Sequence, residues 1–518
     1  MLILYLIVLS IPVMDYAEVT AGMEGFGITV LEGNKPDTFG VEIIGVRKRI
    51  APGQDIILAR LKGKKIEETG IIGGMSGSPV YINGKLLGAV AYNMGGAFSK
   101  EPICGITPMG SMFDPPKTGF SDVHIKEEIP IPVSFSNVSD AALSLFKEEI
   151  EKMELKGGVW GNATKIPISN SKFPVTDYQS SNYQFFPGSP IGVSLVSGDA
   201  RIGAVGTVTC VDGDRVYAFG HRFLGLGAVE LPITTAHIHT VASSYLASFK
   251  IAEMGNNIGC VDMDAFTGIS AIIGKSPPMV DMTVENGNIT YRYKLAKEER
   301  LFPLLVNLML ASSIFMDYSM GYVTYSAVFN IDAKEREIGF SDTYSGEVMD
   351  AVTAMAGDIN SVFENNYTGL NVKSINFNLI PSYTLKMAQI KDIQGDLRND
   401  TLFLICTVEP YRGKLARIEQ KIPIRNSDGK KPLMISASGC DGMKKRMWEE
   451  IRDFDEFVSY LENRPKRTSL VIQVSSQDDD FLPPSYSKFI KREKRPLYEK
   501  VIETEWVISG GASYEIDK

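Results

Sequence analysis

The chain has 518 residues, of which 44% are hydrophobic and 22% are charged. This composition is typical of a folded globular protein, and it excludes a disordered or multi-span membrane chain. At roughly 100–200 residues per domain, the length predicts about three domains. The formal net charge is -9 and the Lys and Arg residues are scattered. Because no basic face is available for phosphate backbones, we expect no nucleic-acid partner.

The five cysteines are widely spaced and odd in number, which predicts neither a disulfide framework nor a CxxC metal pair. We expect them to be small buried hydrophobic residues. Imidazole chemistry is limited to four histidines, which are His124, His221, His237 and His239.

Residues 1–13, MLILYLIVLSIPV, form an apolar run. The run is short for a bilayer span but long enough for the hydrophobic region of a signal peptide. We therefore expect an exported protein, in the periplasm or attached to the cell envelope, with residues 1–17 as signal peptide or membrane anchor. No Lys or Arg precedes the run, and Asp15 stands before a possible cut after Ala17. Cleavage and retention both stay open, and a buried N-terminal strand is the alternative.

Short strand-like runs broken by turns predict a β unit over residues 18–118 and a second one over 189–345. In the first unit, Asn83-Gly84 separates PVYI from KLLGAVAY. This pair predicts a hairpin, because both central residues of a type I′ turn need positive φ. In the second unit, Asp212-Gly213 predicts another hairpin by the same reasoning.

Residues 119–188 are expected to hold one helix, over 139–156, followed by a connecting segment rich in Gly and Ser. Apolar residues recur at helical spacing in that helix, and Ser139 or Asp140 would cap it. The apolar run 301–316 is interrupted by proline and polar residues. We therefore predict a buried helix there and not a membrane span.

The last part of the chain is predicted to be a linker helix over 346–373 followed by a β-rich C-terminal domain over 374–518. That domain should include one amphipathic helix over 447–461, ended by Pro465. A final strand is expected over 501–509, after a charged loop. The predicted fold class is mainly β with a few helices.

The sharpest motif is GGMSGSP, residues 73–79. Gly74 and Gly77 allow a tight turn that would expose the Ser76 hydroxyl. The same turn would direct the amides of Gly74 and Ser76 at a developing oxyanion. This is the trypsin-like GxSG arrangement. An α/β-hydrolase elbow would need GxSxG, and Ser78 occupies the last place.

A nucleophilic serine needs a base, and His221 in YAFGHRF directly follows the second predicted hairpin. The alternative is that His221 is an ordinary hydrogen-bonded core or loop residue. His237 and His239 would share one face of a strand, which could begin a zinc site. No third ligand is evident nearby, so we predict a polar strand face there, with no metal and no cofactor.

Three segments resemble the SpoIVB-type peptidases, the family named for stage IV sporulation protein B. They are GGMSGSPVYINGKLLGAVAY, GTVTCVDGDRVYAFGH and SFKIAEMGNNIGCVDMDAFTGISAIIG. Together they cover most of residues 18–339. The resemblance implies a trypsin-like double β-barrel, with Ser76 as nucleophile, His221 as general base and a protein or peptide as substrate.

The sequence departs from that family in three ways. Serine precedes histidine here, although triads are defined by geometry and not by order. There is no room for the PDZ domain that the sporulation protein carries. The family's acidic residue lies shortly upstream of the serine, where this chain reads Leu61-Lys62-Gly63. The resemblance therefore assigns no triad acid.

Physical reasoning offers Asp264 or Asp262 as the acid, since both follow His221 in a segment of strand and turn residues. We favour Asp264, because the following AFTG offers a turn that could bend it toward the imidazole. The alternative is that both carboxylates lie on a solvent face. A dyad without an acid also stays open, as does a carboxylate such as Asp55 or Glu230.

The sequence thus predicts an exported serine endopeptidase acting on envelope or extracytoplasmic proteins. The alternative is a catalytically weak or inactive peptidase-like scaffold of the cell envelope.

Overall fold

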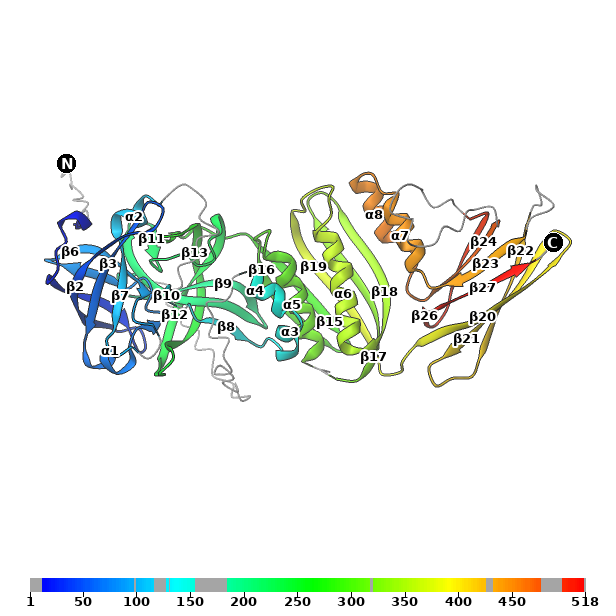
Figure 1. Cartoon of the computed structure of the whole chain (residues 1–518), viewed down its shortest axis with the longest axis horizontal. Coiled ribbons are helices and arrows are strands. Elements are labelled where there is room, and N and C mark those ends of the chain that lie inside the picture. The colour runs from blue at the N-terminus through cyan, green and yellow to red at the C-terminus, as the bar shows by residue number, and fades with distance from the viewer. Residues whose placement is uncertain are drawn as a thin grey trace, which may run out of the picture. The chain divides into compact units, whose positions relative to one another are not determined.

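The computed structural model of the protein (Figure 1) describes residues 12–96, 99–115, 127–129, 131–153, 184–316, 320–424, 432–476 and 496–516. Most of the predicted signal segment, His124, most of the Gly- and Ser-rich connection and most of the charged C-terminal loop lie outside these residues. The chain forms two compact units, Met1–Val280 with Tyr293–Met309 and Asp281–Arg292 with Leu310–Lys518.

The first unit begins with a closed six-stranded barrel in the order β1-β2-β3-β7-β6-β5. Its strands are β1 (Glu24–Val30), β2 (Pro36–Ala51), β3 (Gln54–Lys62), β5 (Pro79–Ile82), β6 (Lys85–Asn93) and β7 (Ile103–Pro108). The predicted β5–β6 hairpin is confirmed, because Ile82 pairs with Lys85. Asn83 and Gly84 both have positive φ, at 51° and 74°.

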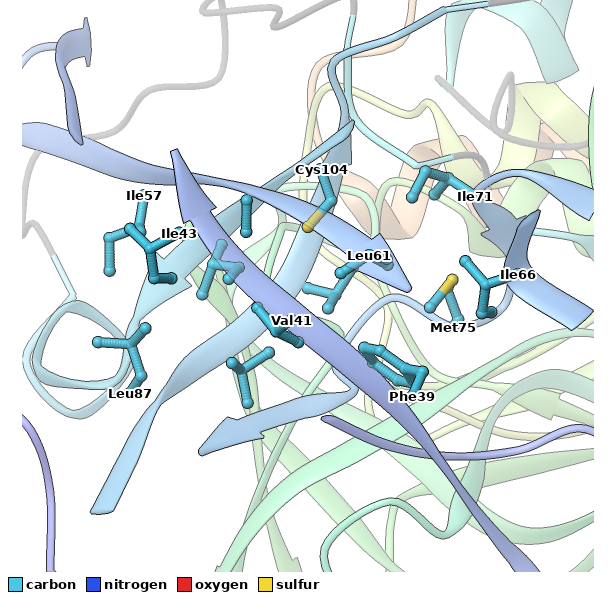
Figure 2. Packing of buried hydrophobic residues seen from close by; sticks show 14 of the residues in the cluster. Phe39, Val41, Ile43, Ile57, Leu61, Ile66, Ile71, Met75, Leu87 and Cys104 are labelled. Carbon is cyan, nitrogen blue, oxygen red and sulfur yellow. The ribbon is translucent and has the colours of Figure 1, made fainter. Parts of the chain in front are cut away.

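Alternate residues of the barrel strands point inward and form one core, as Phe39, Val41 and Ile43 of β2 do. Figure 2 shows these side chains. At one end of this core Met75 lies near Ile66 of helix α1 (Lys64–Thr69). A second short helix, α2 (Met109–Phe113), follows β7. Because Met75 is a core residue, the turn that carries Ser76 is fixed by the packing of the barrel.

Residues just after the apolar N-terminal run are attached to the barrel. The amide of Leu86 donates to the carbonyl of Pro12 at 2.8 Å, and the amide of Met14 donates to the carbonyl of Leu86 at 2.9 Å. Met14 is buried in the barrel core, and a single 3₁₀ turn, η1 (Tyr16–Glu18), follows. Residues 12–14 thus form a short extended stretch beside β6.

Seven further strands of the first unit are β8 (Val133–Ser136), β9 (Pro190–Gly198), β10 (Arg201–Asp212), β11 (Arg215–Ala218), β12 (Gly227–Ala242), β13 (Ser248–Ala265) and β14 (Gly268–Ile273). Strand β9 pairs with both β10 and β12. The pairings β9-β12-β13-β14-β11-β10 therefore return to their starting strand. The mainly β prediction is confirmed with one six-stranded barrel, whereas a trypsin-like pair of barrels stays a prediction.

Two predicted local features differ in detail from the structure. The helix expected over 139–156 is two helices, α3 (Asp140–Leu145) and α4 (Lys147–Lys152), joined at Phe146. Ser139 caps the first, its Oγ accepting from the amide of Ala141 at 3.2 Å. The second hairpin is present, but Asp212 pairs with Arg215, so its central residues lie one position later than expected.

In the second unit, strands β15 (Met279–Asn286), β17 (Tyr322–Ala333), β18 (Glu337–Glu347) and β19 (Val372–Ser382) are joined in the order β18-β17-β19-β15. The chain passes between the two units within β15, β16 (Ile289–Ala296) and helix α5 (Phe302–Phe315). Helix α5 fulfils the prediction of a helix over the apolar run. Among the described residues, no helix is long and apolar enough to cross a membrane.

Helix α6 (Val348–Phe363), which we expect to be a linker, packs against β17 and β18 (Figure 1). Beyond it lie two four-stranded sheets, β22-β21-β20-β26 and β25-β24-β23-β27. Their strands are β20 (Met387–Arg398), β21 (Thr401–Pro410), β22 (Ala416–Pro423), β23 (Leu433–Ser438), β24 (Ser469–Ser476), β25 (Tyr498–Glu503), β26 (Val507–Ser509) and β27 (Gly511–Ile516). One apolar core is shared by both sheets, so they form a sandwich.

Two C-terminal predictions are wrong. The single amphipathic helix is two helices, α7 (Asp441–Glu449) and α8 (Phe454–Asn463). Asp453 starts the second helix, because its Oδ1 accepts from the amide of Glu456 at 2.9 Å. The single last strand is also two strands, since β25 pairs with β24 and β26 pairs with β20 of the opposite sheet.

Candidate active site

The turn that carries Ser76 follows β4 (Ile72–Gly73), which pairs with the start of β13. Gly74 and Gly77 have φ of +89° and +94°, which agrees with the expectation that this turn needs glycine at both positions. A Cβ at Gly77 would lie 2.0 Å from the carbonyl oxygen of Thr207. Only glycine fits this close approach between the serine turn and β10.

Thr207 of β10 joins the serine turn to the histidine segment. Its amide donates to the carbonyl of Ser76 at 2.9 Å, and its carbonyl accepts from the amide of Phe219 at 3.2 Å. On the other side, the hydroxyl of Thr107 in β7 donates to the carbonyl of Gly220 at 2.6 Å. The segments that carry Ser76 and His221 therefore meet where the six-stranded barrel contacts β10.

The backbone before His221 is strained. Phe219 has a φ of +69°, a conformation that is rare for a bulky side chain and costs of order 1–3 kcal/mol. The Phe219 ring is fully buried against Gly206, where a Cβ would lie 2.2 Å from it. Such strain persists only where the surroundings fix it, and here it sets the direction in which the chain enters His221.

His221 is 2% exposed, and its Nδ1 lies 2.8 Å from the carbonyl oxygen of Arg222. Because a carbonyl oxygen can only accept, Nδ1 carries the proton and Nε2 keeps its lone pair. Burial lowers the pKa of His221 to about 4, and the charge of Arg222 acts in the same direction. At neutral pH the imidazole is therefore neutral, in the tautomer that a general base needs.

Ser76 is 0% exposed, which overturns the expectation that its hydroxyl is exposed. The reason is tertiary, since β10 and Phe219 pack directly over the turn. Ser76 Oγ and His221 Nε2 are both buried without a hydrogen-bond partner among the described residues. The two atoms are consequently not bonded to each other. A buried polar group left unpaired costs about 1–3 kcal/mol, so native proteins rarely keep one without a role.

The amide of Ser76, expected to face an oxyanion, makes no backbone hydrogen bond within the described residues. Ser78, by contrast, is fully paired, because its hydroxyl donates to the carbonyl of Met75 at 2.6 Å. The two serines of the motif therefore differ in a property that matters for a nucleophile, because only the Ser76 hydroxyl is not already committed to the backbone.

The two candidate acids occupy different surroundings. Asp262 lies 2.7 Å from Arg215 and accepts from the hydroxyl of Ser270 at 2.6 Å. Asp264 is 1% exposed, and its carboxylate accepts three backbone amides of the loop directly after His221. Neither carboxylate is bonded to the His221 ring, whose Nδ1 faces the Arg222 carbonyl. The expected direct hydrogen bond from Asp264 or Asp262 to the ring is therefore absent from the described structure, and the role of either residue as the acid stays a prediction.

Lys250 of β13 is a buried residue that sequence reasoning missed. Its Nζ donates to the hydroxyls of Thr29 at 2.8 Å and Thr207 at 3.3 Å. A Cβ at Gly74 would lie 3.3 Å from the Lys250 Cδ, so the lysine stem lies under the serine turn. Burial lowers the pKa of Lys250 to about 7. The available signal was one cation in the alternating strand SFKIAEM.

Two other features do not include Ser76 or His221. His237 and His239 have ring centroids 5.1 Å apart, but no group of three or more His, Cys, Asp or Glu side chains in the described ranges could hold a metal ion. An open pocket of about 680 Å³ is lined by residues that include Arg49, Asp55 and Ser111. Neither Ser76 nor His221 lines it.

Comparison with known proteins bears on the serine segment. The family model for the SpoIVB peptidase S55 matches residues 7–103. Ser76 and both glycines of its turn lie inside the match, whereas His221 and Asp264 lie outside it. No curated protein and no solved structure matches the chain. The resemblance to SpoIVB-type peptidases is thus confirmed over residues 7–103, the segment that carries the serine.

Proposed function

We propose that the protein is an exported serine endopeptidase of the SpoIVB type, with Ser76 as nucleophile and His221 as general base. The main support for this proposal is the buried, unpaired Ser76 hydroxyl. It lies in a GxSG turn inside the segment that matches the S55 peptidase model. The substrate would be a protein of the envelope or another extracytoplasmic protein.

In the proposed reaction, Ser76 Oγ attacks a peptide carbonyl carbon while its proton moves to Nε2 of His221. The oxyanion that forms would be held by the amides of Gly74 and Ser76. The protonated imidazole then gives its proton to the leaving amine, and water hydrolyses the acyl-enzyme by the same steps in reverse order. The tautomer at His221 supports this assignment, because Nε2 is the nitrogen with a free lone pair.

We also propose that the strands β9 to β14 act as the second half of a trypsin-like arrangement. Their pairings return to β9, and they carry His221, while the six-stranded barrel carries Ser76. Because Ser76 and His221 are both buried, substrate would reach them only after the packing around them has opened.

A fluorophosphonate probe, which labels activated serines, tests the nucleophile. Wild-type protein should be labelled slowly, at a rate limited by opening of the site, and Ser76→Ala should not be labelled at all. Intact-mass and peptide-mass analysis would locate the adduct, and circular dichroism would verify the fold of the variant.

Ser78→Ala is the matched control, since Ser78 lies in the same turn and is equally buried. It should retain the adduct on Ser76. Labelling that survives in Ser76→Ala and disappears in Ser78→Ala would overturn the assignment.

The second candidate function is a scaffold that has lost peptidase activity. Two observations favour it, namely the complete burial of Ser76 and the carbonyl, in place of a carboxylate, beside Nδ1 of His221. A scaffold would not be labelled by the probe, even in mild denaturant or with peptide substrates present. It would still unfold cooperatively, which would show that the protein was folded. Labelling that increases under those conditions would favour the peptidase.

Export is proposed from the apolar run over residues 1–13. The pairing of residues 12–14 with β6 and the burial of Met14 support retention of these residues in the folded protein. N-terminal sequencing of protein from the envelope fraction should accordingly find Met14 present. Recovery from the cytoplasm would contradict export, and a new N-terminus after Ala17 would contradict retention.

A further inference from the structure

The peptide group between residues 222 and 223 lies between Asp264 and His221. Its C=O, from Arg222, accepts from Nδ1 of His221 at 2.8 Å. Its N–H, from Phe223, donates to Oδ1 of Asp264 at 2.7 Å. We propose that Asp264 orients and polarises His221 through this 222–223 peptide group, as a positioning residue that replaces the direct acid of a triad. The proposal rests on the function proposed above for Ser76 and His221.

A peptide group can transmit such an effect because it is planar and resonance-stabilised, with its N–H and C=O on opposite edges. A carboxylate at the N–H draws positive charge toward itself and leaves the carbonyl oxygen more negative. Chains of hydrogen bonds strengthen one another in this way. Asp264 is 1% exposed, so water screens its charge little.

The donor set around Asp264 favours its ionised form. Oδ1 accepts from the amide of Phe223, and Oδ2 accepts from the amides of Leu224 at 2.8 Å and Leu226 at 3.1 Å. Backbone N–H groups can only donate, and a protonated carboxyl would give up part of this acceptor capacity. Burial raises the pKa of Asp264, while these amides oppose the rise.

The arrangement would serve catalysis at two points. Before reaction, three amides bonded to one carboxylate fix the loop over residues 223–226, which holds the Arg222 carbonyl on Nδ1 and leaves Nε2 free. When Nε2 takes the serine proton, the new positive charge is shared with Nδ1–H, which faces a carbonyl made more negative by Asp264. No proton leaves Nδ1 in either step.

Other titratable groups surround this loop and have to be considered in any pH measurement. The guanidinium of Arg222 is buried and lies 3.5 Å from the carboxylate of Glu128. Both groups act electrostatically on the buried phenol of Tyr92. These residues are unchanged in the variants below, so a difference between variants reports the change at Asp264 or Asp262.

The test compares Asp264→Asn with Asp262→Asn. Both substitutions remove one carboxylate from β13, two positions apart, but the Asp262 partners are Arg215 and Ser270. Two quantities are measured on the full chain, the rate of fluorophosphonate labelling at Ser76 and the ¹⁵N spectrum of protein labelled selectively at histidine. The spectrum reports the tautomer and titration midpoint of His221 whether or not the protein is a peptidase.

We expect Asp264→Asn to slow labelling by about 10- to 100-fold, less than the ~10⁴-fold loss seen when a directly bonded acid is removed from a triad. The His221 titration midpoint should fall, and its Nδ1–H tautomer should become mixed. Asp262→Asn should match the wild type in both measurements. If wild-type Ser76 is never labelled but these spectral changes occur, the positioning role stands and the peptidase function fails.

A merely structural role for Asp264 would lower thermal stability while leaving the ¹⁵N spectrum and the labelling rate of the folded protein unchanged, which would overturn the proposal. Equal changes in Asp262→Asn would also overturn it. Should Asp264→Asn not fold, wild-type protein provides the test. The amide proton of Phe223 should then shift with the same midpoint as His221, whereas the Leu226 amide should shift less. Equal shifts of the Phe223 and Leu226 amide protons would contradict transmission through the 222–223 peptide group.

Discussion

Two buried polar regions of this protein differ in whether their polar groups have partners. In the second unit, Asp342 and Asp358 are enclosed by the cations of Lys444, Arg464 and Arg467. In the first unit, Ser76 Oγ and His221 Nε2 are buried without partners in the described structure. The carboxylates of the second unit are paired with cations and hold elements together, whereas the Ser76 hydroxyl and the His221 Nε2 are not committed to any partner in the described structure. The comparison separates a structural cluster from a chemical site.

The structural cluster joins parts of the chain that are distant in sequence. Arg467 lies 2.7 Å from both Asp342 of β18 and Asp358 of α6, and the hydroxyl of Tyr344 donates to Asp358 at 2.6 Å. Although burial opposes ionisation, the guanidinium groups of Arg467 and Arg464 hold the pKa of Asp358 below its usual value. The sandwich is thereby fastened to the sheet and helix that precede it.

The largest effect is expected from breaking this cluster. Arg467→Met should lower the free energy of unfolding by about 3–5 kcal/mol, because it leaves two buried carboxylates short of a cation. Urea denaturation followed by tryptophan fluorescence would measure it, since Trp448 and Trp506 both lie in the second unit. As control, Arg398→Met removes an ion pair with Asp396 that is largely exposed, and about 0–1 kcal/mol is expected. Similar losses in both variants would contradict the structural role of the cluster.

A smaller effect tests the candidate site. Alanine substitutions at two neighbouring serines should change the free energy of unfolding in opposite directions. Ser76→Ala removes an unpaired buried hydroxyl, and the free energy of unfolding should rise by about 1 kcal/mol. Ser78→Ala removes a hydroxyl bonded to the Met75 carbonyl, and a fall of about 1 kcal/mol is expected. Thermal denaturation followed by circular dichroism would compare them. A loss of stability in Ser76→Ala would mean that its hydroxyl has a partner after all.

The last effect depends on pH and concerns Lys250. Burial lowers its pKa to about 7 from the usual value of 10.5, so the unfolded chain binds more protons between these two values. Stability should therefore rise with pH across that window, by at most about 1.4 kcal/mol per pH unit from this residue. Lys250→Met should flatten the rise. A wild-type stability that does not rise between pH 7 and 10 would show that Lys250 stays charged in the fold.

Parts of the site were predictable because they depend on local backbone geometry. The glycines at positions 74 and 77 indicate a turn with positive φ, and both adopt it. Asn83-Gly84 indicates a two-residue hairpin, and the register agrees. Such features follow from the steric freedom of a few consecutive residues, so the sequence alone is sufficient.

Other parts were not predictable because their partners are distant in sequence. One error was instead local, since Asp453 caps a second helix inside the amphipathic pattern over 447–461 and its partner Glu456 is only three residues away. Asp264 was expected beside the His221 ring. In the structure its carboxylate oxygens accept from backbone amides of the loop that follows His221, about 40 residues earlier in the chain. The tertiary path of the loop after His221 decides which groups surround the Asp264 carboxylate, and no spacing in the sequence encodes that path.

By itself the sequence determined a mainly β chain, the serine turn and the identity of the residues with suitable chemistry. Only the tertiary structure decided that Ser76 is buried, because Thr207 and Phe219, more than 100 positions away in sequence, pack over its turn. It also decided that a backbone carbonyl faces Nδ1 of His221. Burial and hydrogen-bond pairing are properties of neighbours in space, so they become fixed only when distant strands meet.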